Sequence, residues 1–243
     1  MLWFWLSFTT ALTQAVKEAC LKRCLRDMDA VVAVMAYSLL AACFFWLSAS
    51  LEPLPVLSAN FWPVLAVGTL IGAVTFLLYG KALKSGDLSL TLPMLAFTPL
   101  FLLVTSPLTL GEFPAPAGLI GLVCVVVGSY VLNLRERRKG FWGPVRALWT
   151  TPSARLMLLV AAIWSVGANF DKLGLGASSP RFWIAAVYTT SSLSLLPTLL
   201  RRSHGVRAQL LRTPGWLLAA GFMEAVGLVC QMHALPLTMV SYV

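Results

Sequence analysis

The chain has 243 residues, of which 59% are hydrophobic and 11% are charged, and its mean hydropathy is +0.84. Soluble domains carry roughly 25% charged residues, so this composition excludes an ordinary water-exposed surface and requires lipid as solvent for much of the chain. The net charge of +9 would suggest nucleic acid in a soluble protein. Here the basic residues stand in short runs between apolar stretches, which indicates topology signals and contacts with lipid headgroups, and no nucleic-acid partner is predicted.

Eight apolar stretches are long enough to cross a bilayer, which takes about 20 residues of α-helix. Polar or proline-containing breaks separate them. The stretches run approximately over residues 2–19, 30–49, 61–78, 88–108, 115–134, 156–170, 182–200 and 215–235, and a ninth begins near residue 236. We therefore predict an all-α, polytopic membrane protein with about eight complete transmembrane helices.

An internal repeat emerges when the chain is aligned with itself at an offset of about 151 residues. Tyr37 then falls on Tyr188, and Glu18 falls on Asn169. The first three helices match the sixth to eighth helices in order and spacing. This predicts a first repeat over residues 1–134, a basic cytoplasmic linker over 135–153, and an incomplete second repeat over 154–243 with three helices and the start of a fourth.

The basic residues favour one side of the predicted membrane. All of them except Lys172 and Arg181 fall in alternate loops, which share one face if successive helices reverse direction, and Lys17 is assigned to the first of these loops. The positive-inside rule makes this face cytoplasmic. Because five helices per repeat is an odd number, the second repeat must enter the membrane inverted. Inverted repeats are typical of secondary transporters.

Several short motifs resemble a known family. The run YGKALKSGDLSLTLP covers residues 79–93, and it is followed by FTPLF at 97–101, LGEF at 110–113, GLIGL at 118–122 and VGSYVLN at 127–133. This order resembles the third to fifth helices of an EamA-type repeat of the drug/metabolite transporter superfamily. The resemblance implies ten helices in two inverted five-helix repeats and transport of metabolites by alternating access. Against that pattern the chain is two helices short, and we interpret it as C-terminally truncated.

Polar residues inside apolar helices are the candidate substrate-binding residues, because ionisable groups are costly in the bilayer. Glu224 lies near the middle of the eighth helix, and Gln231 follows two turns later. A carboxylate there is suited to bind a proton or a cationic substrate. The alternative is a protonated glutamate that bonds to a neighbouring helix. Asn169 and Asp171 near the end of the sixth helix are further candidates, with helix capping as the alternative for Asp171.

Four more residues are candidates to line a cavity: Gln14, Tyr79, Thr98 and Trp164. We expect helices one, three, four, six and eight to line the site. Pro93 and Pro99 predict a kink in the fourth helix. The pair Gly68 and Gly72 predicts close helix packing.

The predicted function is secondary transport of a small metabolite or drug-like molecule through a multi-pass protein of the plasma membrane, in bacteria the inner membrane. A flippase for a lipid-linked substrate and a non-transporting membrane interaction protein remain alternatives. The sequence shows no catalytic or phosphate-binding motif, so no enzyme is predicted, and neither a cofactor nor a metal site is expected. The predicted partners are the metabolite and the lipid bilayer, with proton coupling and a homodimer left open.

Overall fold

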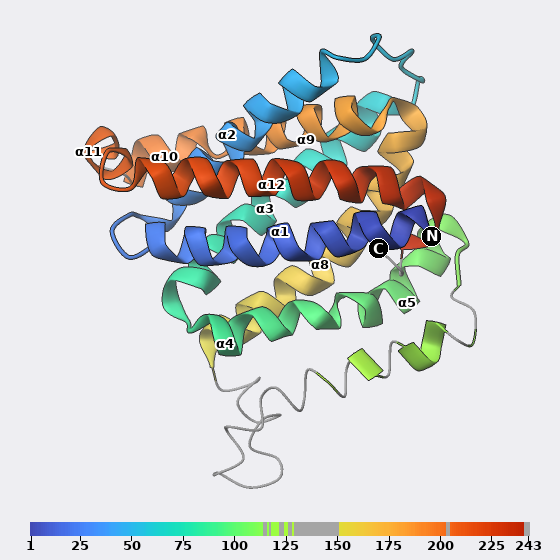
Figure 1. Cartoon of the computed structure of the whole chain (residues 1–243), viewed down its shortest axis with the longest axis horizontal. Coiled ribbons are helices and arrows are strands. Elements are labelled where there is room, and N and C mark those ends of the chain that lie inside the picture. The colour runs from blue at the N-terminus through green and yellow to red at the C-terminus, as the bar shows by residue number, and fades with distance from the viewer. Residues whose placement is uncertain are drawn as a thin grey trace, which may run out of the picture. The chain divides into compact units, whose positions relative to one another are not determined.

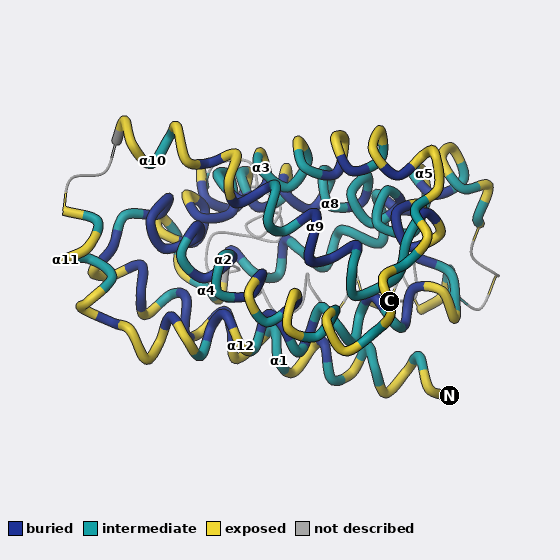
Figure 2. The backbone as a smooth tube through the Cα atoms, turned by 90° about the horizontal axis from the view of Figure 1, so that it is seen from above, coloured by how far each residue is buried: buried dark blue, intermediate teal, exposed yellow. Residues whose placement is uncertain are grey.

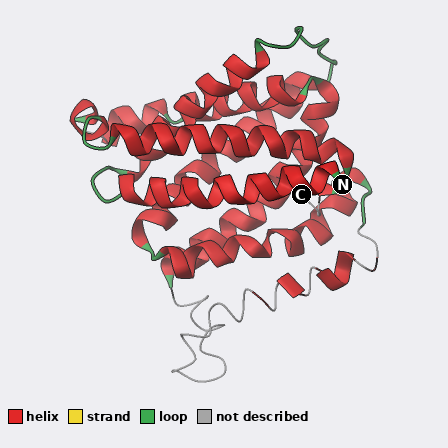
Figure 3. Cartoon of the chain, viewed as in Figure 1, coloured by secondary structure: helices red, strands yellow, loops and turns green. Residues whose placement is uncertain are grey.

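The computed structural model describes residues 1–113, 151–202 and 205–240, together with positions 116, 118–121, 124, 125 and 128. Within these residues all regular structure is helical (Figure 3). The helices in chain order are α1 Leu2–Cys24, α2 Ala30–Ala49, α3 Phe61–Ser85, α4 Leu88–Thr91, the 3-10 helix η1 Leu92–Phe97, α5 Thr98–Leu110, α8 Pro152–Ala177, α9 Pro180–Ser194, α10 Leu196–Arg202, α11 Val206–Leu210, α12 Pro214–Ala234 and the 3-10 helix η3 Leu235–Leu237 (Figure 1).

Six helical segments of the described residues are long and apolar enough to cross a membrane. They are Ala30–Ala49, Phe61–Ser85, Leu92–Leu110, Pro152–Ala177, Pro180–Arg201 and Pro214–Leu237. The predicted all-α, polytopic fold class is thereby confirmed. The predicted first span is a continuous helix, α1, but it does not reach the same mean hydropathy, because its second half is polar. Most of the predicted span 115–134 and most of the linker 135–153 lie outside the described residues, so the division into repeats stays a prediction.

Local sequence signals explain where several helices begin. The Asp29 carboxylate accepts a hydrogen bond from the Val31 amide at 2.9 Å and caps α2. The Ser179 hydroxyl caps α9 in the same way. Pro180 then occupies the first turn, where a missing backbone N–H costs nothing. These caps fix the start of each helix at the polar breaks that the sequence predicted.

The chain divides into two compact units, which are described separately. The first unit contains residues 1–77, 170–238 and 243, and the second contains residues 78–169 and 239–242. In the first unit α1 runs beside α12, while α2 packs against α9 and α12 (Figure 1). Helices far apart in the sequence therefore form its core.

Small residues allow these helices to approach one another closely. A Cβ added to Gly221 of α12 would lie 2.7 Å from the Cβ of Leu40 on α2. A Cβ added to Gly68 of α3 would lie 3.1 Å from Val187 of α9, and one added to Gly72 would overlap Ser191. The predicted packing role of the Gly68 and Gly72 pair is therefore confirmed.

The second unit contains the predicted fourth helix, which prolines divide. Pro93 lies at the start of η1 and Pro99 lies at the start of α5. Pro107 stands inside α5, and Gly111 ends that helix in the left-handed conformation at φ 69°. At the place where the prolines predict a kink, the structure has a six-residue 3-10 segment between two α-helices.

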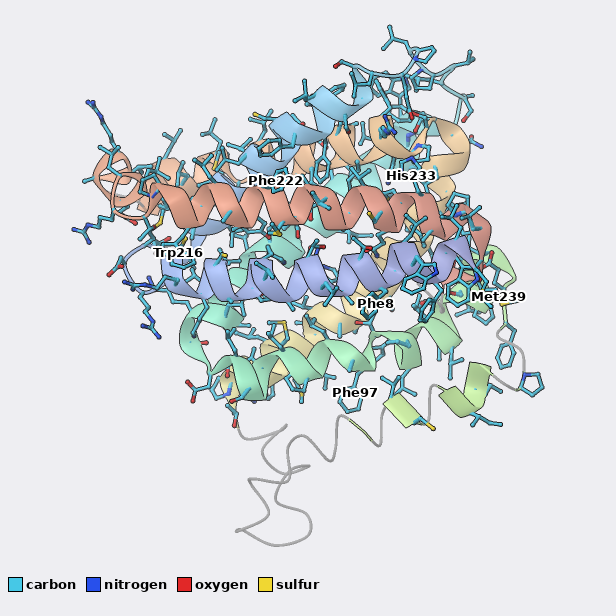
Figure 4. The ribbon with its side chains drawn as sticks, in the orientation of Figure 1. Phe8, Phe97, Trp216, Phe222, His233 and Met239 are labelled. Atoms are coloured by element: carbon cyan, nitrogen blue, oxygen red, sulfur yellow. The ribbon has the colours of Figure 1, made fainter. Side chains whose placement is uncertain are left out.

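Large apolar side chains remain exposed on the helices of the first unit. Phe8 of α1 is 47% exposed, and Trp216 and Phe222 of α12 are 50% and 46% exposed (Figure 4). Exposed stretches recur along both helices in Figure 2. This arrangement suits lipid as the surrounding solvent, because hydrocarbon does not penalise an exposed apolar face.

Candidate functional site: a buried ion cluster

Glu224 is the centre of a polar cluster in the first unit. Its side chain is buried on α12, and its two carboxylate oxygens accept bonds from two different helices. The Gln14 amide nitrogen on α1 donates to Oε2 at 2.8 Å, and the Tyr188 hydroxyl on α9 donates to Oε1 at 2.5 Å. The carboxylate therefore joins α1, α9 and α12.

Two oppositely charged neighbours on α1 complete the cluster. The ammonium nitrogen of Lys17 lies 2.7 Å from Oε1 of Glu18 and 3.5 Å from Oε2 of Glu224. Lys17 is 2% exposed and Glu18 is 6% exposed, so both charges are removed from solvent. Lys17 also lies over the ring of Tyr37 on α2, at 5.7 Å from the ring centroid. Lys17 thus contacts both carboxylates and one aromatic face.

Two aromatic side chains pack against the ring of Tyr188, and a pair of serines joins α9 to α2 nearby. The rings of Phe45 on α2 and Phe76 on α3 pack edge-to-face against it at 5.2 and 5.3 Å between centroids. One turn further along α9, Ser192 donates to the hydroxyl of Ser38 at 2.8 Å. The packing of α2 and α3 against this ring therefore helps to orient the phenol toward Glu224.

We refer to Lys17, Glu18 and Glu224 as the ion triad. Its formal charges are one positive and two negative, and all three side chains are buried. Burial of a charge is costly unless partners compensate for the lost hydration, and removal of one partner from such a group is strongly destabilising. In a membrane helix an arrangement of this kind marks a functional site by default.

The other predicted candidates of the first unit lie apart from the bonds of the triad. Asp171 on α8 accepts a hydrogen bond from the indole nitrogen of Trp183 at 2.8 Å. It ties α8 to the buried start of α9, which is a packing role beyond simple capping. Gln231 is half-buried on α12, two turns beyond Glu224.

The second unit holds the remaining predicted residues. Asn169 is fully buried on α8 and accepts a hydrogen bond from the Ser106 hydroxyl of α5 at 2.8 Å. Tyr79 is buried on α3, and its ring faces Trp164 of α8 at 5.5 Å between centroids. The hydroxyl of Thr98 is buried at the start of α5 and has no hydrogen-bond partner among the residues that the structure describes.

The structure corrects the sequence analysis at Lys17. The charge pattern places this residue in a cytoplasmic loop, but it lies inside α1 and is buried. Its position three residues after Gln14 was the available signal, because that spacing places both side chains on one helix face.

Tyr188 was not predicted as a site residue, although the internal alignment pairs it with Tyr37. Both tyrosines border the ion triad. The cluster draws on α1 and α12, which are the first and eighth predicted helices, and also on α2 and α9, which the sequence did not indicate; which helices line a substrate site stays a prediction.

Comparisons with known proteins identify the family of the chain. The crystal structure of another protein matches this chain with a TM-score of 0.62 at 18% identity, over 94% of this chain and 77% of that chain. At this identity the likeness supports the fold alone. No match was found among curated proteins. The family model described as the EamA-like transporter family matches residues 1–134, which is more than half of the sequence. The chain therefore belongs to the EamA-like transporter family.

Proposed function

We propose that this protein is a secondary transporter that moves a small metabolite or drug-like molecule by alternating access, with the ion triad at its working centre. The observation that carries the proposal is the buried triad itself, which joins α1 to α12 and bonds to α9 through Tyr188. The chain belongs to a transporter family, and ionisable groups inside membrane helices are functional candidates because their burial is costly.

The geometry links the charges of the triad to the packing of α1 against α12. Lys17 lies between two carboxylates on different helices, 2.7 Å from one and 3.5 Å from the other. A change of charge at either carboxylate alters the attraction between α1 and α12. In a secondary transporter such a change can bias one helix arrangement over another, which is the requirement for alternating access.

Transport assays in proteoliposomes test the proposal. The purified protein is reconstituted, and uptake is measured with a panel of radiolabelled metabolites and cationic dyes. We expect at least one solute to accumulate above the level of empty liposomes, and we expect Glu224→Gln to remove most of that accumulation. Glu52→Gln is the matched control, because Glu52 is a partly exposed carboxylate that pairs with Arg181 at 3.1 Å, away from the triad.

Two outcomes would overturn the proposal. In the first, no solute of the panel accumulates in the proteoliposomes, and cells that express the Glu224→Gln variant are as sensitive to the same solutes as cells that express the wild type. In the second, only labelled lipid crosses the bilayer, which would favour the flippase that the sequence left open.

A further inference from the structure

Three sulfur-containing side chains follow one another at the end of α1. Cys20 and Cys24 are one helical turn apart, and Met28 comes four residues later. The backbone keeps its helical turn beyond Cys24, because the amide of Asp27 donates to the Cys24 carbonyl oxygen at 3.1 Å. Residues four apart share a helix face. All three sulfur-containing side chains are at most 4% exposed, so two thiols and one thioether are buried along the same face.

The hydroxyl of Thr213, at the N-cap of α12, joins two of these sulfur atoms. It donates to Sδ of Met28 at 3.5 Å, and the Cys24 thiol is hydrogen-bonded to the same hydroxyl. A threonine at this position normally bonds to an amide of the first helical turn. Thr213 makes no such capping bond among the described residues, and its buried hydroxyl contacts sulfur instead. Cys24 and Met28 therefore approach one common point.

The turn that carries Met28 is fixed by two hydrogen bonds. The amide of Asp29 donates to the side-chain oxygen of Gln209 on α11 at 2.8 Å, and the Arg212 guanidinium donates to the carbonyl oxygen of Asp27 at 3.4 Å. A ligand on such a turn loses little conformational freedom when it binds an ion, and this lowers the entropic cost of binding. The thioether is thus already held beside the end of α1.

The ligand chemistry selects the kind of metal. Thiolate and thioether ligands favour soft ions such as Cu(I) and disfavour hard cations. Structural zinc sites take four ligands from Cys, His, Asp and Glu, and the described residues contain no cluster of three such groups. From the sequence we expected no metal site, since the two cysteines match no zinc motif. The thioether of Met28 adds a third soft ligand to them.

We propose that Cys20, Cys24 and Met28 form a three-sulfur site for a soft monovalent metal ion, Cu(I), for which Ag⁺ is a chemical analogue. Each thiol gives up its proton when the ion binds, so the complex of two thiolates with Cu(I) carries one negative charge. The guanidinium of Arg23 interacts electrostatically with Cys24 and favours this charge. The site lies apart from the ion triad, and it does not depend on the proposed transport.

Competition with a coloured chelator measures Cu(I) binding without a known substrate. The starting protein is the full chain in which the other three cysteines are replaced by alanine, namely Cys43, Cys124 and Cys230. It is purified in detergent without oxygen and titrated into the Cu(I) complex of bathocuproine disulfonate, whose absorbance falls as the protein takes the ion. We expect the starting protein to bind one Cu(I) per chain.

Variants of the starting protein identify the ligands. Loss of even an outer partner of a metal site lowers affinity by about 10–100-fold, so we expect Cys20→Ala, Cys24→Ala and Met28→Leu each to weaken Cu(I) binding by at least about tenfold. Met232→Leu is the matched control, because Met232 is a methionine of α12 that is also 2% exposed. It should bind Cu(I) as tightly as the starting protein does.

The proposal is overturned if the starting protein takes no Cu(I) from the chelator, or if Met28→Leu and Met232→Leu bind it equally well. Exchange of methionine for leucine nearly conserves volume, so this comparison stands even where a cysteine variant does not fold. Thermal unfolding gives a second readout: excess Ag⁺ should raise the Tm of the starting protein, and an unchanged Tm would count against the site. Neither readout uses solute transport, so failure of the proposed function would leave both results intact.

Discussion

Replacement of Gly221 by alanine should separate two helices that carry the candidate site. The added Cβ would lie 2.7 Å from the Cβ of Leu40, 3.2 Å from the carbonyl oxygen of Tyr37 and 3.4 Å from the amide nitrogen of Ala41. Two of these three atoms belong to the backbone of α2, and the third is fixed to it. No side-chain rotation relieves the overlap, so α2 and α12 must move apart.

The size of the effect follows from the distances. Carbon atoms pack best at about 3.5–4.0 Å, so the contact with Leu40 requires a displacement of about 1 Å. Overpacking of this kind typically costs 1–3 kcal/mol, and we expect about 2 kcal/mol because backbone has to move. On the scale of chains with 150–250 residues, this corresponds to a loss of about 4–8 °C in Tm.

The assay is thermal unfolding of the purified protein in detergent, followed by tryptophan fluorescence. Gly215→Ala is the matched control on the same helix, since a Cβ at Gly215 meets no atom within 4 Å. It should leave Tm unchanged or raise it slightly through higher helix propensity. Because Glu224 stands one turn from Gly221, the Gly221 variant should also reduce transport at temperatures where it remains folded.

Equal melting temperatures for Gly221→Ala and Gly215→Ala would refute the reasoning. Such a result would mean that α2 and α12 can accommodate a methyl group where they cross. The contact between their backbones would then not determine the position of Glu224 relative to α2.

Three further predictions concern polar bonds. Tyr188→Phe removes the hydroxyl that donates to Glu224. Because hydrogen bonds to charged groups contribute about 1.5–3 kcal/mol, the variant should lower transport at least tenfold. Solute uptake at matched protein levels measures this loss. Asn169→Ala leaves the buried hydroxyl of Ser106 without its acceptor and should lower the free energy of unfolding by about 1–3 kcal/mol. The double variant with Ser106→Ala should recover part of this loss, and thermal unfolding measures both. Arg181→Gln removes a partly exposed ion pair with Glu52 and a hydrogen bond to the carbonyl oxygen of Ser48. Together these contribute about 1–2 kcal/mol, so the variant should lower Tm by about 2–8 °C.

Sequence pattern alone predicted the described spanning helices and singled out Glu224 as a candidate site residue. Spanning helices follow from long apolar runs, and Glu224 stands out as a carboxylate in such a run. Charged residues near the end of a run are ambiguous, because an interfacial lysine and a buried lysine have the same local sequence. Lys17 was misassigned for that reason, and only its contact with α12 resolves the ambiguity.

Contacts between helices distant in sequence were beyond prediction. Tyr188 and Gln14 lie 36 and 210 residues from Glu224, and no local pattern joins them. The sequence of a helix shows which of its faces is apolar. Which other helix packs against that face depends on the shapes of the side chains on both helices. The glycines are a partial exception, since Gly68 and Gly72 predicted a close approach without naming α9 as the partner.

The proline-divided fourth helix has a mechanical consequence. A 3-10 helix rises about 2.0 Å per residue and an α-helix about 1.5 Å, so the six residues of η1 make this segment about 3 Å longer than an unbroken α-helix would be. That is the rise of two α-helical residues, gained without any insertion. A change of η1 toward α-helical winding would draw the two ends of the segment together by the same amount. The winding of the stretch between Pro93 and Pro99 therefore sets the length of this spanning segment, in addition to the number of its residues.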